Sequence, residues 1–175
     1  SFLFADVRGS TALAERMEPA AFRNLLNRFY TAATDVLLAQ DALVDKFVGD
    51  EVIGLFIPAL SGADHAARAI AAARDLLRRT GHGVGLEPWL PIGAGVHTGV
   101  AFVGAVGNET GVRDLTALGD AVNTAARLAS AALAGEILVS DAAAAKAGMD
   151  AGGRERRDLV LKGKTERVGV QVLTS

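Results

Sequence analysis

The sequence predicts a mixed α/β domain in which helices cover a largely antiparallel sheet. Of its 175 residues 50% are apolar, which is enough for one compact core. Short apolar runs of strand length alternate with longer segments whose apolar residues recur at helical spacing. Because the chain contains neither an internal repeat nor a linker long enough to divide it, we expect residues 1–175 to form one domain.

The individual elements follow from apolar periodicity and from the residues that interrupt it. Pro19 stands where the first turn of a helix tolerates proline. Gly49-Asp50 separates two apolar runs and favours a hairpin turn, and Asp120 is a suitable N-cap for an Ala-rich helix. The expected strands are residues 2–7, 42–48, 51–57, two that meet at a turn within 90–106, 115–118, 136–139, 159–161 and 167–173; the expected helices are residues 19–39, 61–79, 120–132 and 140–147; and the expected turns or loops are residues 81–91, 108–111 and 148–157.

Composition excludes several classes of protein. Eighteen Lys and Arg against 20 Asp and Glu give a net charge of -2, so no overall basic field attracts nucleic acid or anionic lipid. The absence of cysteine excludes disulfides, thiolate zinc sites and a cysteine nucleophile, and it permits a reducing compartment. Every apolar stretch is interrupted before the ~20 residues that a membrane span needs. We therefore expect a cytoplasmic domain without nucleic-acid or membrane contact, which the start at Ser1 indicates is excised from a longer multidomain protein that could itself be membrane-tethered.

Two aspartates lie at the ends of expected strands, near glycines. Asp6 stands shortly before Gly9, and Asp50 follows Gly49 in the expected hairpin turn. Carboxylates on adjacent strand tips suit a hard divalent cation such as Mg²⁺, which also takes oxygen ligands from a substrate phosphate. Each Asp taken alone is also a common turn residue, so the alternative is that both only form turns.

Three further groups could bind an anion. Residues 8–11 lead from a strand towards a helix, where backbone N–H groups can hold phosphate oxygens, although the P-loop signature is absent. Asn123 and Arg127 share one face of the expected helix, and the Arg fork suits charge that develops on a phosphate. Lys162 precedes the last strand and could bring an ammonium group to a polyphosphate. The alternatives are a solvated helix face and an ordinary exposed lysine.

None of the three histidines is predicted to be catalytic. His97 accompanies neither a nucleophile motif nor a second histidine at ligand spacing, so we interpret it as structural. We expect His65 and His82 at the surface.

Five segments occur in an order that is more specific than any one of them. They are Phe-Ala-Asp-Val-Arg-Gly-Ser-Thr at residues 4–11, Asp-Lys-Phe-Val-Gly-Asp-Glu at 45–51, Gly-Val-His-Thr-Gly at 95–99, Leu-Gly-Asp-Ala-Val-Asn-Thr-Ala-Ala-Arg-Leu at 118–128 and Leu-Lys-Gly-Lys at 161–164. Together they resemble the class III adenylate and guanylate cyclase catalytic domain over essentially the whole chain. Two departures are Ser10, where many members carry Phe, and the short segment 107–113.

The resemblance implies an α+β fold with a ferredoxin-like βαββαβ core plus additional strands and helices, and a head-to-tail homodimer with its sites at the interface. Asp6 and Asp50, with the backbone of Val7, match the site for two Mg²⁺ or Mn²⁺ ions. In the family these aspartates come from one subunit and the residues for the base, the ribose and the transition state from the other. The remaining matches are Lys46 and Thr116 for the purine base, Asn123 for the ribose, Arg127 for the α-phosphate in the transition state, and Arg8, Gly9, Ser10, Thr11 and Lys162 for the polyphosphate.

The implied reaction converts ATP to cyclic AMP and pyrophosphate through attack of the ribose 3′-hydroxyl on the α-phosphate, which requires no protein nucleophile. A Lys donor at 46 and a hydroxyl at 116 complement N1 and the N6 amino group of adenine. Family guanylate cyclases tend to place Glu at the position of Lys46, so we expect ATP as the substrate. Thr at 116 also resembles the subgroup linked to bicarbonate stimulation, which implies bicarbonate as an activator.

Four alternatives remain. A catalytically silent cyclase-like domain would bind nucleotide without turnover, and a guanylate cyclase would turn over GTP. A diguanylate cyclase would carry a Gly-Gly-Asp/Glu-Glu-Phe turn, which this chain lacks around Asp50. An interaction domain without a ligand would leave the aspartates and the Asn123 and Arg127 face without a purpose. The complete set of matched positions favours an active enzyme.

Overall fold

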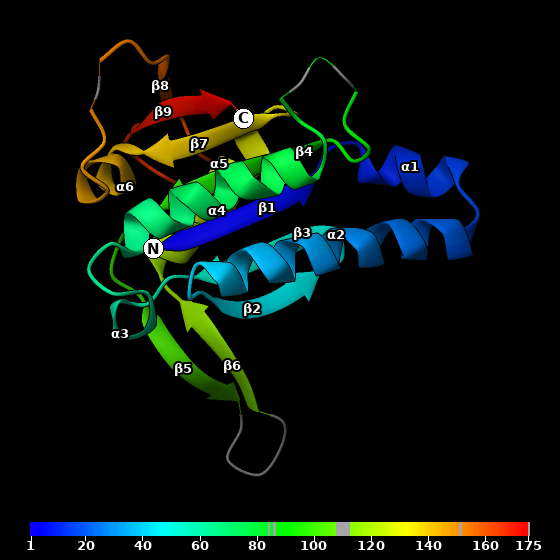
Figure 1. The fold of residues 1–175 in the computed structure, drawn as a ribbon. Coiled ribbons are helices and arrows are strands. Elements are labelled where there is room, and N and C mark those ends of the chain that lie inside the picture. Colours follow the sequence, from blue (N-terminus) through cyan, green and yellow to red (C-terminus); the bar gives the residue numbers. More distant parts are fainter. Residues whose placement is uncertain (84, 86, 108–112, 151, 175) are drawn as a thin grey trace.

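The computed structural model describes residues 1–175 except 84, 86, 108–112, 151 and 175. Strands and helices are interspersed along the described chain (Figure 1). The strands are β1 (Phe2–Val7), β2 (Leu43–Val48), β3 (Glu51–Leu55), β4 (Ile92–His97), β5 (Phe102–Gly107), β6 (Arg113–Leu118), β7 (Glu136–Ser140), β8 (Arg156–Leu159) and β9 (Val168–Thr174). The helices are α1 (Ser10–Arg16), α2 (Pro19–Ala39), α3 (Pro58–Ser61), α4 (His65–Arg79), α5 (Asp120–Ala131) and α6 (Asp141–Lys146).

Seven strands form the main sheet in the order β2-β3-β1-β4-β7-β9-β8. Strand β1 pairs antiparallel with both β3 and β4, and β2 pairs antiparallel with β3. Helix α2 connects β1 to β2, and α4 connects β3 to β4. The β2-β3-β1-β4 order with these two helical connections is the ferredoxin-like βαββαβ arrangement, and the added strands β7, β9 and β8 extend it beyond β4. The predicted fold class is confirmed.

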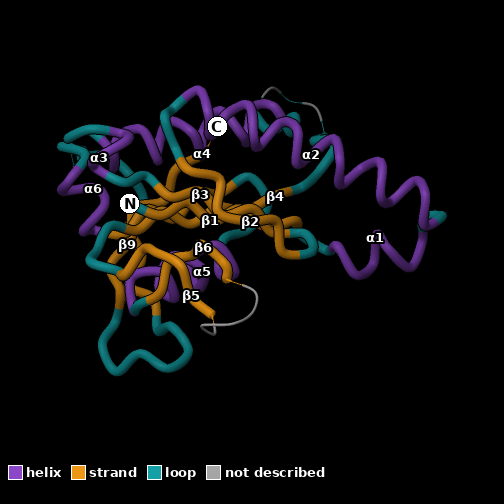
Figure 2. The backbone as a smooth tube through the Cα atoms, turned by 90° about the horizontal axis from the view of Figure 1, so that it is seen from below, coloured by secondary structure: helices purple, strands orange, loops and turns teal. Residues whose placement is uncertain are grey.

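The alternation of side chains along β1 divides the core between the two faces of the sheet. Leu3, Ala5 and Val7 belong to the core under α2 and α4, whereas Phe2 and Phe4 belong to the core under α5. Figure 2 shows α2 and α4 on one side of the sheet and α5 on the other. Asp6 continues the Phe2 and Phe4 series, so the period of two places it on the α5 side at the end of the strand.

Glycines in β4 let α5 lie directly on the sheet. A Cβ at Gly95 would lie 2.6 Å from the carbonyl oxygen of Ala125 and 2.7 Å from the Cβ of Leu128, so no larger residue fits without moving the helix. The small residues Ala125 and Ala129 face the sheet from the helix side and are fully buried. This close packing fixes the position of α5, which carries Asn123 and Arg127.

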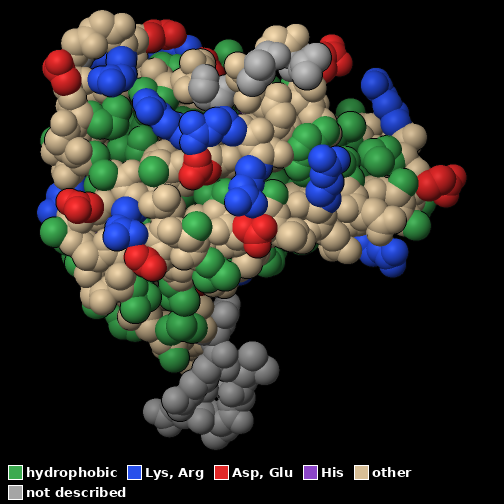
Figure 3. All heavy atoms as spheres, in the orientation of Figure 1, with side chains coloured by type: hydrophobic (Ala, Val, Ile, Leu, Met, Phe, Trp, Pro, Cys, Tyr) green, Lys and Arg blue, Asp and Glu red, His purple; other side chains and the backbone are tan. Residues whose placement is uncertain are grey.

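Strands β5 and β6 form a separate antiparallel ribbon that projects from the body of the domain (Figure 1). Large apolar side chains of the ribbon are exposed, with Phe102 at 57%, Leu115 at 53% and Leu118 at 50%. In Figure 3, hydrophobic side chains gather over the ribbon, whereas charges of both signs are interspersed above it. The predicted turn at residues 108–111 lies outside the described residues.

Several predicted boundaries are corrected by tertiary structure. The helix predicted from residue 61 begins at His65, because the short α3 and a break precede it. The two strands predicted within 90–106 exist, but they do not pair, because β4 joins the main sheet and β5 pairs with β6. A first helix, α1, was not predicted, and β8 begins at Arg156 within the stretch expected to lack structure. Asp120 is the first residue of α5 rather than its N-cap, which is Gly119.

The prediction that His65 and His82 lie at the surface is wrong. His65 and His82 are buried, at 6% and 8% exposed. His82 Nε2 accepts a hydrogen bond from the Ile92 N–H at 3.1 Å, so it connects the end of α4 to the start of β4. His97 is structural as predicted, because its Nδ1 lies 2.8 Å from the Ser140 hydroxyl that caps α6. Burial lowers the pKa of His97 to about 4, so this ring is neutral at physiological pH.

Candidate active site

The structure brings Asp6 and Asp50 together. Asp6 lies near the end of β1, and Asp50 lies in the two-residue turn between β2 and β3. The Val7 N–H donates to the Asp50 carbonyl oxygen at 3.2 Å, which holds this turn against β1. Burial is the main factor that raises the pKa of the Asp6 carboxyl, and the nearby Asp50 raises it further. The two carboxylates predicted from strand ends therefore form one acidic group.

A third carboxylate, Glu51, completes this group and was not predicted. The antiparallel register pairs Glu51 of β3 with Asp6 of β1. Burial, followed by the charges of Asp6 and Asp50, raises the pKa of Glu51 to about 7. No local signal in the sequence indicated this, because the pairing of β3 with β1 joins segments that are more than 40 residues apart.

The acidic group has the chemistry of a divalent cation site that needs a substrate to complete it. Among the described residues, no cluster of three or more His, Cys, Asp or Glu has the geometry to hold a metal ion alone. Burial, and then the charges of neighbouring carboxylates, raises the pKa values of Asp6 and Glu51, so a bound cation would stabilise their ionised forms. Oxygen donors suit Mg²⁺ or Mn²⁺. The donor set therefore fits a metal whose remaining ligands are phosphate oxygens and water.

Glu51→Gln is expected to raise the unfolding free energy of the metal-free protein at pH 8 and to leave it unchanged near pH 4. Folding raises the pKa of Glu51 from 4.5 to about 7, so the folded state holds this proton more tightly than the unfolded state. Stability is consequently lost as the pH rises through this interval, and Gln escapes the loss. Urea unfolding at the two pH values measures the effect, with exposed Glu15→Gln as the control. A pH-independent effect of Glu51→Gln would contradict this account.

Arg8 links the acidic group to the end of α5. One guanidinium nitrogen of Arg8 forms an ion pair with Asp6. The other donates to the carbonyl oxygens of Ser130 and Ala132, both at 3.1 Å. Arg8 was predicted to bind phosphate, and in the structure its side chain is directed to these protein groups, so it holds Asp6.

The segment that follows Arg8 lies beside Asp50. Gly9 is the N-cap of α1, and Ser10 and Thr11 form its first turn. Ser10, Thr11 and Asp50 line a hollow of about 320 Å³, with apolar side chains of α1 and α2 on its other wall. The structure thus groups these predicted phosphate-binding residues with a predicted metal ligand.

Tyr30 of α2 supports the turn that carries Asp50, and sequence reasoning did not find it. Its hydroxyl donates a hydrogen bond to the Gly49 carbonyl oxygen. Its ring stacks on Phe47 of β2, with ring centroids 4.5 Å apart and an interplanar angle of 26°. Burial, and then the charge of Asp50, raises the pKa of this phenol. Tyr30 therefore fixes the position of the turn from the opposite face of the sheet.

The two residues predicted to read a base come from different sheets. Lys46 lies on β2 opposite Ile53 of β3, and Thr116 lies on β6 opposite Gly104 of β5. The Thr116 hydroxyl donates to the Asp45 carboxylate at 3.3 Å. This hydrogen bond joins the projecting ribbon to the edge of the main sheet and places Thr116 next to the residue that precedes Lys46.

Asn123 and Arg127 lie on the side of α5 away from the sheet, as their spacing predicted. Asn123 is exposed and Arg127 is half-buried. Gly163, which follows Lys162, lies against the Arg127 guanidinium, and a Cβ there would be 3.3 Å from Arg127 Nη2. The structure therefore groups Arg127 with the predicted phosphate-binding turn.

The described residues form two separate groups. None of the hydrogen bonds or ion pairs of the described chain joins the acidic group, which comprises Asp6, Asp50 and Glu51, to the cationic group of Arg127 and Lys162. The carboxylates of the acidic group suit a metal ion, and the cations of the other group suit a phosphate.

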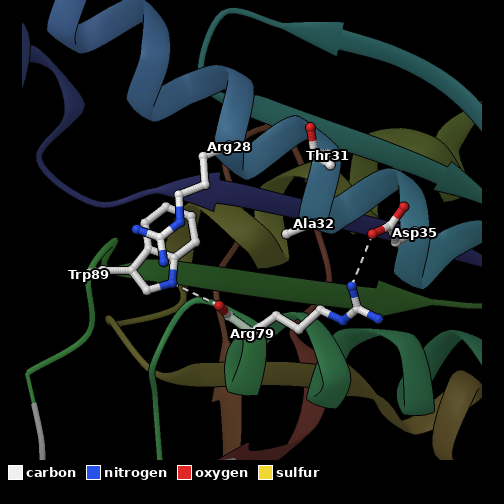
Figure 4. A pocket seen from close by; sticks show the side chains of 6 residues that line it. All are labelled: Arg28, Thr31, Ala32, Asp35, Arg79 and Trp89. Atoms are coloured by element: carbon white, nitrogen blue, oxygen red, sulfur yellow. Dashed lines mark hydrogen bonds and ion pairs between the residues drawn. The ribbon is translucent and has the colours of Figure 1, made fainter.

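A different hollow, of about 510 Å³, lies on the α2 and α4 side of the sheet (Figure 4). The Arg28 guanidinium lies 3.8 Å above the centre of the Trp89 ring, and Trp89 Nε1–H donates to the Arg79 carbonyl oxygen at 2.7 Å. The Arg79 side chain pairs with Asp35 at 3.2 Å. The polar groups of this hollow are occupied by one another, so it offers no catalytic arrangement.

Comparison with known proteins decides the family. The family model for the adenylate and guanylate cyclase catalytic domain matches residues 1–174. This chain belongs to that family. Among its relatives, an adenylate cyclase of Anabaena cylindrica is 34% identical over 134 residues, which are 73% of this chain and 26% of the relative. The cyclase domain described here thus spans about a quarter of the length of that protein.

Two solved structures resemble this cyclase domain closely. The guanylyl cyclase Cya2 has a TM-score of 0.84 at 30% identity, covering 98% of this chain and 89% of that one. The adenylyl cyclase CyaB from P. aeruginosa has a TM-score of 0.82 at 32% identity, covering 99% and 93%. Both structures have the same fold, and their names differ in base specificity. No helix in the described part of the chain is long and apolar enough to cross a membrane.

Proposed function

We propose that this domain converts ATP to 3′,5′-cyclic AMP and pyrophosphate at sites formed between two copies of the chain. The observation that carries the proposal is the division of complementary groups within one chain. The acidic group can hold metal ions, and the face with Asn123 and Arg127 can hold ribose and phosphate, but no described contact joins them. A head-to-tail pair of chains would bring the acidic group of each against the cationic group of the other.

The protein side chains position the substrate and stabilise charge. Asp6 and Asp50 would hold the metal ions, which neutralise the triphosphate and lower the pKa of the 3′-hydroxyl when bound. The bond from O3′ to the α-phosphorus forms while the bond to the bridging β-phosphate oxygen breaks, and the hydroxyl proton leaves to solvent. Arg127 donates to the α-phosphoryl oxygens as charge develops, Asn123 orients the ribose, and Lys162 binds the departing pyrophosphate.

Exposed apolar surface supports the paired arrangement. Phe102, Leu115 and Leu118 of the projecting ribbon are each at least half exposed, and Phe47 on the edge strand β2 is 40% exposed. The β5–β6 register places Phe102 and Leu118 on the same face of the ribbon as Thr116, and Leu115 on the other face. Exposed apolar side chains of this size are typical of protein interfaces. A second copy of the chain seated on the first face would cover Phe102 and Leu118 and would bring Thr116 to the same interface.

ATP is expected to be preferred over GTP, with kcat/KM higher by about tenfold or more. The Lys46 ammonium donates to adenine N1, and the Thr116 hydroxyl accepts from the N6 amino group, whereas guanine presents the reverse pattern. Product formation from each nucleotide with Mn²⁺, over a range of protein concentrations, measures the preference. Similarity to the guanylyl cyclase Cya2 makes GTP cyclisation the second candidate, and a kcat/KM that favours GTP would establish it. Binding of both nucleotides by a dimer without turnover would indicate a silent domain.

A further inference from the structure

The turn that carries Lys162 is anchored to α5 at both of its ends. Leu161 is buried and packs in a core cluster with Leu128 of α5. The Lys164 N–H donates to the Leu161 carbonyl oxygen at 3.0 Å, which closes the turn. Gly163 has a φ of 75°, a conformation that glycine adopts without strain. These contacts define the path of the backbone on either side of Lys162.

The second anchor is an ion pair. The Lys164 ammonium binds the carboxylate of Asp120, the first residue of α5. The side chain of Lys164 is only 21% exposed, so most of its length packs along the protein surface. The hydrogen bond from Lys164 holds the pKa of Asp120 below its usual range, so this carboxylate stays ionised at neutral pH.

Between the anchors, the turn touches Arg127. Gly163 has so little space above it that a Cβ would lie 3.3 Å from Arg127 Nη2. Lys162 is exposed beside this contact. The ion pair therefore holds the segment on which Lys162 stands, and its Asp120 carboxylate also interacts electrostatically with Arg127.

We propose that Asp120 and Lys164 are positioning residues that hold the turn where the Lys162 ammonium reaches the polyphosphate. The inference rests on the proposed function, because it concerns the same substrate. An exposed ion pair contributes little to global stability. It can still determine the fraction of molecules in which a short turn occupies its binding position. The apparent affinity for substrate is the intrinsic affinity multiplied by this fraction.

Lys164→Met is expected to raise KM for ATP by about fivefold while kcat changes by less than about twofold. Asp120→Asn should have the same effect because it removes the other partner, and Lys164→Arg should keep KM near that of the wild type because it preserves the pair. Lys146→Met at the end of α6 is the matched control, since it removes an exposed lysine elsewhere.

A double-mutant cycle separates positioning from direct binding. In a Lys162→Ala background, Lys164→Met should change KM by less than about twofold, because the positioned group is already absent. The same fivefold increase in both backgrounds would overturn the proposal, and so would an unchanged KM in Lys164→Met alone. A structural defect would lower the melting temperature and would act equally in both backgrounds.

Pyrophosphate binding, measured by calorimetry, gives the same comparison without turnover. One outcome is that the wild type does not cyclise nucleotides, but Lys164→Met lowers pyrophosphate affinity only when Lys162 is present. That outcome would overturn the proposed activity and keep the positioning role. If the wild type is active and Lys164→Met leaves pyrophosphate affinity unchanged, the activity stands and the positioning role is overturned.

Discussion

Asp50→Ala is expected to lower kcat by about 10³-fold, which corresponds to roughly 4 kcal/mol of transition-state stabilisation. Asp50 lies in the β2–β3 turn against Asp6, and in the proposed role its carboxylate would hold a metal ion. Without that ligand, the metal would no longer lower the pKa of the 3′-hydroxyl or balance the charge of the leaving pyrophosphate. Cyclic AMP formation at saturating Mn²⁺ and ATP measures the loss.

Unfolding does not explain this expected loss. Asp50 raises the pKa values of both Asp6 and Glu51, so its removal relieves repulsion in the metal-free protein. The melting temperature of Asp50→Ala without metal should therefore equal or exceed that of the wild type. Asp158→Ala, which removes an exposed carboxylate on β8, is the matched control and should keep full activity. More than about a tenth of wild-type kcat in Asp50→Ala would contradict the assigned metal role.

Arg127→Ala is the second large effect, with an expected loss of kcat of about 10² to 10³-fold and little change in KM. The guanidinium is half-buried beside Gly163. In the proposed role its donors would serve charge that appears mainly in the transition state, so the effect is expected in kcat. Steady-state kinetics with ATP checks this, and Arg23→Ala on the exposed side of α2 is the control.

Arg127→Lys tests whether charge alone is enough. A planar guanidinium can donate to two phosphoryl oxygens at once, whereas an ammonium offers a single point charge. We expect Arg127→Lys to remain at least about tenfold below the wild type in kcat. If Arg127→Ala instead raises KM by a similar factor and leaves kcat unchanged, this residue acts in ground-state binding.

Local signals in the sequence predicted two of the three carboxylates of the acidic group, Asp6 and Asp50. The turn at Gly49-Asp50 and the end of β1 are set by residues close in sequence, and both occur as predicted. Asn123 and Arg127 share a face because the period of a helix is fixed. The ferredoxin-like core was an implication of ordered motifs, and its strand order is confirmed.

The sequence did not predict which strands pair when they are far apart along the chain. Nothing local to β4 and β5 indicates that one joins the main sheet and the other pairs with β6. Glu51 acquires its raised pKa only because antiparallel register places it opposite Asp6. Tyr30 reaches the Gly49 carbonyl across a chain separation of 19 residues, and His82 is buried because it bonds to the start of β4. Each of these contacts depends on how distant segments pack.

The most direct test of the central claim is activity after mixing Asp50→Ala with Arg127→Ala. Each variant alone should be nearly inactive. A mixed dimer has one site in which both defects meet and one site with an intact acidic group and an intact Arg127. Equal mixing should therefore recover about a quarter of wild-type activity, since half of the dimers are mixed and each has one working site. Recovery near this level is the predicted result; no recovery, with mixed dimers demonstrated, would contradict an active site shared between two chains.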